Sequence, residues 1–159
     1  GLLKIKVCKM NASALADIAV TGRDIPYKPF SFYPGFVYKI LDVDLAHRTV
    51  EMILKFEPDS VCFYHRHLGP VASLVLDGEH HIKEVRADGT VASSVRRVGE
   101  FTMADHRHAH IEGGGPAGGV IFFSFRCEQD HIYDILDDDL KVAYQVTVQD
   151  FKAALDAWN

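Results

Sequence analysis

The sequence has few cysteines, no long apolar run and no basic cluster, and each lack excludes a class of protein. Its cysteines, Cys8, Cys62 and Cys127, are odd in number and show no C-x-x-C spacing, which argues against a disulfide framework or a cysteine zinc site. No stretch approaches the roughly 20 apolar residues that a membrane-spanning helix needs. The amino-terminal residues also lack the apolar core of a signal peptide. Reduced thiols and no export signal lead us to expect a cytoplasmic protein.

The charge balance limits the kinds of partner. The net charge is −5 and no run of Lys or Arg interrupts the sequence. Nucleic acids and anionic membranes attract proteins through clustered positive charge, so neither is expected as a partner.

The length of 159 residues predicts one domain, residues 1–159, with its core over about 30–128. Segments 36–44 and 49–56 alternate apolar and polar residues around the short connection "LAHR", which is typical of a β-hairpin. Further short runs of this kind are divided by Asp-Gly and Pro-Asp turns. This pattern predicts an all-β sandwich or barrel. The glycine-rich stretch 113–119 predicts a flexible loop near the barrel mouth.

The carboxy-terminal stretch 147–158 predicts an α-helix. Thr147 and Asp150 have the spacing of a capping box, and Phe151, Leu155 and Trp158 recur at helical spacing. The apolar stripe would pack on the outside of the barrel. Residues 11–20 give a weaker helical pattern.

Histidine is in surplus, with nine in the chain. His65 and His67 are two residues apart in a predicted strand, so their side chains share one face with Val61 and Phe63. Two neutral imidazoles on an apolar face leave polar nitrogens that cost free energy without a partner. A divalent metal would satisfy both nitrogens. The alternative is a pair of hydrogen-bonded core histidines.

The downstream sequence resembles the two motifs of the cupin superfamily. The first motif is matched at His65, His67 and Gly78, and the second at Gly99 and His110. The resemblance implies a double-stranded β-helix, the cupin jelly-roll barrel, with a metal near its mouth held by His65, His67 and His110. Cupins of this sort commonly form dimers, so a homodimer is expected.

The sequence departs from the cupin pattern where a metal-binding glutamate is usual, because Val71 occupies that position. In one completion the metal keeps only the three histidines. In the other, a ligand arrives from the next predicted strand, where an inward Ile82 places His80 and Glu84 on the same side. Glu84 is then the candidate fourth ligand, or a catalytic base beside the ligating histidines. Its alternative role is an ordinary solvated strand residue.

Within the superfamily, "HRHLGPVASLVLDGEHHIKE" is similar to the branch of acetylacetone-cleaving and 2,4'-dihydroxyacetophenone dioxygenases. "DIPYKPF" at 24–30 resembles the segment before the barrel there and in ChrR-type anti-sigma cupin domains. The resemblance implies a non-haem Fe(II) dioxygenase that uses dioxygen to cleave a C–C bond of a small diketone or hydroxyketone. Apolar side chains could form its substrate pocket, namely Phe63, Phe101, Met103, Phe123 and Phe125.

Two other functions stay open at this point. One is a non-oxidative metal cupin, an isomerase or hydrolase, since imidazole ligands also suit zinc, nickel and manganese. The other is a non-catalytic metal-binding sensor of the anti-sigma type. The alternative for most of the five pocket residues is ordinary barrel core.

Overall fold

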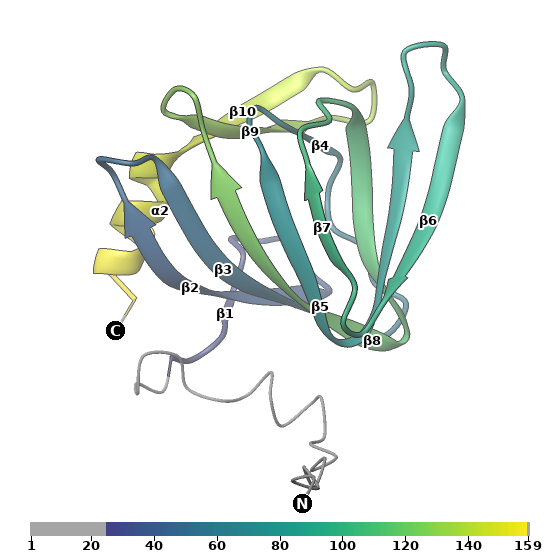
Figure 1. The fold of residues 1–159 in the computed structure, drawn as a ribbon, viewed down its shortest axis with the longest axis horizontal. Helices are drawn as coiled ribbons and strands as arrows, with labels where there is room; N and C mark the ends of the chain where they lie inside the picture. Colours follow the sequence, from purple (N-terminus) through teal and green to yellow (C-terminus); the bar gives the residue numbers. More distant parts are fainter. Residues whose placement is uncertain (1–24, 159) are drawn as a thin grey trace, which may run out of the picture.

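The computed structural model describes residues 25–158, which form a strongly curled β-sheet with one helix on its outside (Figure 1). The prediction of residues 11–20 as helix, and Cys8, lie outside the described residues. The elements are β1 (Lys28–Pro29), β2 (Phe36–Asp44), β3 (Thr49–Phe56), β4 (His65–His67), β5 (Val71–Val85), β6 (Val91–Arg97), β7 (Phe101–Ala104), β8 (Ala109–Arg126), β9 (His131–Leu136), β10 (Val142–Thr147) and α2 (Val148–Asp156). The all-β prediction is confirmed.

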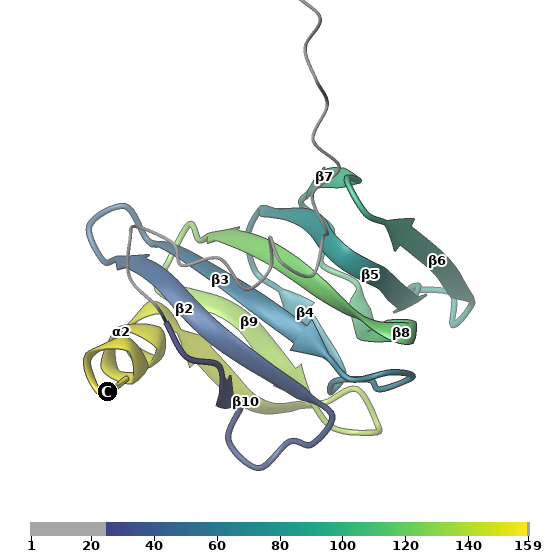
Figure 2. The ribbon, with the colours of Figure 1, turned by 90° about the horizontal axis from the view of Figure 1, so that it is seen from below.

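Hydrogen-bonded neighbours in the sheet follow the order β1-β2-β3-β8-β4-β9-β10, while β5 pairs with β6, β7 and β8. The central strand is β8, whose second half pairs with β3 and whose full length runs along β5. Its first half also meets β4, where His65 lies opposite His110. Figure 2 shows the sheet curling so that β9 and β10 lie across from β2 and β3. This closure brings β4 and β8 together from distant parts of the sequence.

The core fills the space between the curled layers. Ile40, Val50 and Ile121 are completely buried, and Phe123 and Phe125 are nearly so. The alternation of buried and half-buried residues along β2 and β3 is the period-2 pattern that the sequence shows. The expected core of 30–128 extends further in the structure, because β9 and β10 continue the sheet.

The terminal helix forms as predicted. Asp150 N–H donates to the Thr147 hydroxyl at 3.1 Å and the Asp150 carboxylate accepts from the Thr147 N–H at 2.9 Å, completing the capping box. Phe151 is buried, and Trp158, just beyond the helix, meets the ring of Tyr38 edge-on at 5.0 Å. The helix therefore covers the outer side of the core. Among the described residues, no helix is long and apolar enough to span a membrane.

The prediction of a flexible loop at 113–119 is wrong, because β8 runs through this stretch without interruption. Glycine serves close backbone packing here. A Cβ on Gly113 would collide with the carbonyl oxygen of Ser60, and a Cβ on Gly119 would collide with that of Glu79. The segment before β4 and strand β5 can thus approach β8 closely, and the first of these contacts lies next to the buried Glu112.

Candidate metal centre

Four buried side chains with metal-binding atoms meet where β4 pairs with β8: His65, His67, His110 and Glu112. Their candidate ligand atoms all lie within 4.8 Å of one another. Two come from each strand at i and i+2, so each pair points to one face of its own strand. The pairing of His65 with His110 brings the two faces together. The structure thus brings together the three histidines that the cupin resemblance predicted; metal binding by them stays a prediction.

Backbone hydrogen bonds orient two of these imidazoles. His65 Nδ1–H donates to the carbonyl of Phe63 and His110 Nδ1–H to the carbonyl of His108, each at 3.0 Å. The Nε2 atoms therefore face the centre: that of His65 lies 3.1 Å, and that of His110 4.0 Å, from Glu112 Oε2. In a neutral imidazole, a hydrogen bond donated by Nδ1–H leaves Nε2 unprotonated and able to bind a metal. Metal-binding histidines usually have this arrangement.

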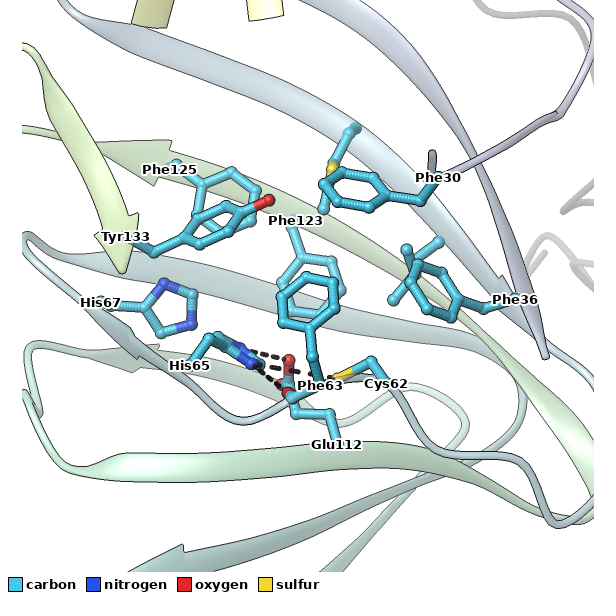
Figure 3. Close-up of a pocket in the computed structure, with 12 residues that line it drawn as sticks. Phe30, Phe36, Cys62, Phe63, His65, His67, Glu112, Phe123, Phe125 and Tyr133 are labelled. Atoms are coloured by element: carbon cyan, nitrogen blue, oxygen red, sulfur yellow. Dashed lines mark hydrogen bonds and ion pairs between the residues drawn. The ribbon is translucent and has the colours of Figure 1, made fainter. Parts of the chain in front are cut away.

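The carboxylate of Glu112 is held from a second side by His80 on β5. His80 is completely buried, and its Nε2–H donates to Glu112 Oε1 at 2.8 Å. Figure 3 shows the side of the carboxylate that faces His65. One oxygen is thus committed to His80, and Oε2 is left facing the histidine group. His80 acts as a positioning residue for this carboxylate.

The electrostatics of the metal-free group favour the metal-binding forms of His67, His110 and Glu112. Burial, together with the neighbouring positive imidazole of His65, holds the pKa of His67 well below its ordinary value and that of His110 at about 4. Burial alone would raise the pKa of Glu112, but the charges and hydrogen bonds of His80 and His65 lower it well below its usual range. For His65, hydrogen bonds to Cys62 and Glu112 outweigh burial and raise the pKa. Glu112 is therefore ionised, and two imidazoles are neutral.

A divalent cation fits these residues. Nδ1 of His67 is buried without a hydrogen-bond partner among the described residues, and such an atom is costly unless a ligand such as a metal ion binds it. Three imidazoles and one carboxylate are a donor set that iron, manganese, nickel and zinc all accept.

Glu84, expected as the fourth ligand, is not a member of this group, and the carboxylate in it is that of Glu112. Glu84 lies opposite His110 in the β5–β8 ladder, so the two side chains are on the same face of the sheet. It is half-buried in an adjacent cavity. The sequence held a signal for the true carboxylate, because His110-Ile111-Glu112 repeats the i, i+2 spacing of His65 and His67. The glycines that follow obscured it by resembling a loop.

An apolar cavity of about 30 Å³ opens on one side of the group (Figure 3). Three of the predicted pocket residues line it: Phe63, Phe123 and Phe125. Tyr133 closes the same wall, and burial raises the pKa of its phenol well above the usual value, so the phenol stays neutral.

Phe101 and Met103 do not line this cavity; they are 63% and 47% exposed on β7. Within residues 25–158 this short strand pairs with β5 alone, at the rim of the sheet. Its inward residues are instead Thr102 and Ala104. The prediction placed the apolar residues inward, but the strand presents the opposite face, and a shift of one residue exchanges every side chain between the two faces.

A second cavity, of about 50 Å³, also borders the group. It shares His67, Glu112 and Phe123 with the apolar cavity. Its further lining comes from β5 to β8 and is more polar, including Ser73, Glu84, Arg96, Thr102 and His106. The ligand group thus borders both an apolar cavity and a more polar one.

Comparisons with known proteins agree on the architecture. No protein-family model and no curated protein matches this sequence. Among solved structures, an acetylacetone dioxygenase from Acinetobacter johnsonii superimposes with a TM-score of 0.68 and 17% identity, covering 89% of this chain and 91% of that one.

Two further structures give similar values. An RmlC-like cupin protein from Ralstonia eutropha has a TM-score of 0.70 and 16% identity, covering 88% of this chain and 85% of its own. A protein from Methylibium petroleiphilum assigned as an acetylacetone dioxygenase has a TM-score of 0.66 and 19% identity, covering 97% and 99%. At these identities the likeness shows a shared fold.

Proposed function

This chain has the cupin fold, and from that premise we propose that it is a metal-dependent dioxygenase that cleaves a C–C bond in a small diketone or hydroxyketone, with Fe(II) as its metal. The observation that carries the proposal is the buried group of three histidines and one glutamate at a junction of two cavities. The likeness to acetylacetone dioxygenases supports the choice of reaction.

In this proposal His65, His67, His110 and Glu112 hold the metal. Fe(II), when bound, supplies a Lewis acid for the oxygen atoms of the substrate and a centre that reacts with dioxygen. One carboxylate among the ligands leaves such a site less positive than three neutral histidines would, while a net positive charge remains to attract an enolate.

The protein's own residues supply orientation and exclusion of water. Phe63, Phe123 and Phe125 present apolar walls to the ligand group, where a small apolar end of the substrate, about the size of a methyl or ethyl group, can pack. His80 holds Glu112 in place from behind. Glu84 is half-buried within the second cavity and is the candidate base that takes a proton from a ketone to form its enolate. A homodimer and a cytoplasmic location stay predictions from the sequence.

The test combines metal analysis with oxygen uptake. Freshly purified protein should contain near-stoichiometric iron and consume oxygen with a panel of 1,3-diketones and hydroxyketones. His110→Ala should lose both properties, whereas His47→Ala, at an exposed histidine in the β2–β3 turn, should retain them. Stoichiometric metal binding without oxygen consumption by any ketone, even after reconstitution with Fe(II), would favour a non-oxidative metal cupin. Absence of metal binding after reconstitution would leave a cupin without a metal-dependent reaction.

A further inference from the structure

Arg96 on β6 brings a positive charge to the polar cavity beside the ligand group. It lies opposite His80 in the β5–β6 ladder, so its side chain is on the face that His80 shares. Among the described residues that line either cavity, it is the only Lys or Arg. Its Nη1 donates to the hydroxyl of Ser73 at 3.1 Å, and Ser73 is buried. The guanidinium is therefore held in place by a neutral partner.

The charge of Arg96 has no counter-ion within the described part of the chain, where no carboxylate lies within 4.0 Å of its nitrogens. Glu84 lines the same cavity without forming an ion pair with it. A guanidinium has five N–H donors, so several remain for a ligand. A half-buried, unpaired guanidinium in a recess is suited to binding an oxyanion, above all a carboxylate that can take two parallel hydrogen bonds.

The dimensions of the cavity agree with a small anionic group. Its volume of about 50 Å³ admits a few water-sized groups, enough for a carboxylate and too little for a ring. Three members of the ligand group, His67, His110 and Glu112, form part of its wall. A substrate that reaches the ligand group with its ketone oxygens could extend an acidic end toward Arg96 and an apolar end toward Phe123 and the other cavity.

We infer that Arg96 binds the carboxylate of the substrate, so that the preferred substrates are oxo acids and not neutral diketones. This inference rests on the proposed function, because it assigns the substrate class of the same site. Arg96 is then the residue that determines specificity between an acid and its neutral analogue.

The test compares two probes that differ in one charge, 2,4-dioxopentanoate and its methyl ester. Each is titrated without oxygen into the Fe(II)-loaded full-length protein, and the dissociation constant is read from the visible absorption of the complex. The wild type should bind the acid at least about tenfold more tightly than the ester, as expected for one charge-assisted hydrogen bond.

Matched variants test whether the preference for the acid depends on Arg96. Arg96→Gln should bind both probes about equally. Arg97→Gln removes the same charge one residue further along β6, at an exposed position, and should keep the wild-type preference.

The outcomes separate the inference from the proposal beneath it. A protein that loads Fe(II) but does not prefer the acid, or that keeps the preference in Arg96→Gln, overturns the inference and leaves the proposed function standing. A preference that survives in Arg96→Gln would mean that the acid is bound by the metal alone. A protein that does not load Fe(II) refutes the proposed function, and the inference with it.

Discussion

The hydrogen bond from His80 to Glu112 offers a quantitative test of the metal centre. His80→Leu keeps a side chain of similar size but removes the donor 2.8 Å from Glu112 Oε1. That oxygen is then buried without a partner, and the carboxylate is free to turn away from the histidines. Loss of such a supporting partner typically lowers metal affinity about tenfold to a hundredfold, or about 1.4–2.7 kcal/mol.

The affinity is measured with Zn(II), which is redox-inert, by competition with a chromophoric chelator at neutral pH. The matched control is His81→Leu. This neighbouring histidine also pairs with a glutamate, Glu79, at 2.6 Å, but its side chain is 39% exposed and it is not part of the ligand group. His81→Leu should bind Zn(II) with wild-type affinity.

A double-mutant cycle identifies the path of the effect. Glu112→Gln alone should weaken Zn(II) binding more than His80→Leu does, because it removes a charged ligand. In the Glu112→Gln background, His80→Leu should cost little further affinity, since the carboxylate through which His80 acts is gone. Equal losses from His80→Leu in both backgrounds, or none in either, would refute the positioning role of His80.

Three other predictions test the fold and the electrostatics around the site. Gly113→Ala places a Cβ against the carbonyl oxygen of Ser60 and should lower the free energy of unfolding by about 1–3 kcal/mol, measured by urea titration. Phe123→Ala, in the core beside the ligand group, should cost about 3–5 kcal/mol in the same assay, whereas Phe101→Ala, at a 63% exposed position, should cost far less. In chelator-treated protein the pKa of His110 is about 4, below that of an unfolded histidine near 6.5. Between these two pH values the unfolded chain binds a proton that the folded chain does not. The contribution of His110 to stability should therefore fall as the pH drops from about 6.5 to 4, by at most about 3 kcal/mol. In denaturant titrations across this range, the free energy of unfolding should decline less steeply for His110→Gln than for the wild type.

Several parts of this structure could be predicted because they depend on local spacing. The alternation in β2 and β3 predicts two strands around one short turn. Thr147 and Asp150 cap a helix by contacts three residues apart. The i, i+2 spacing of His65 and His67 places both imidazoles on one face. In each case the residues are close in the sequence, so the geometry of one strand, helix or turn determines how their side chains lie relative to one another.

The errors arose where contacts between distant strands decide the outcome. The period of a strand says which residues share a face but not which face turns inward, and for Phe101 and Met103 the inward face proved to be the other one. The glycines after Glu112 read as a loop in isolation. In the structure they are strand residues of β8. Glycine is needed at Gly113 and Gly119 because a neighbouring backbone lies too close for a Cβ.

The sequence by itself determined the class of fold, the terminal helix and the three histidines, since repeated spacings along the chain carry that information. The tertiary structure decided which carboxylate joins them. Glu84 and Glu112 are both on the face of the strand pair that turns toward the histidines. Glu84 is on β5, and β8 lies between it and β4, whereas Glu112 is on β8 itself, where His80 holds its carboxylate and its oxygen reaches the group. This order of the strands depends on how the sheet pairs and curls, which involves strands that are far apart in the sequence.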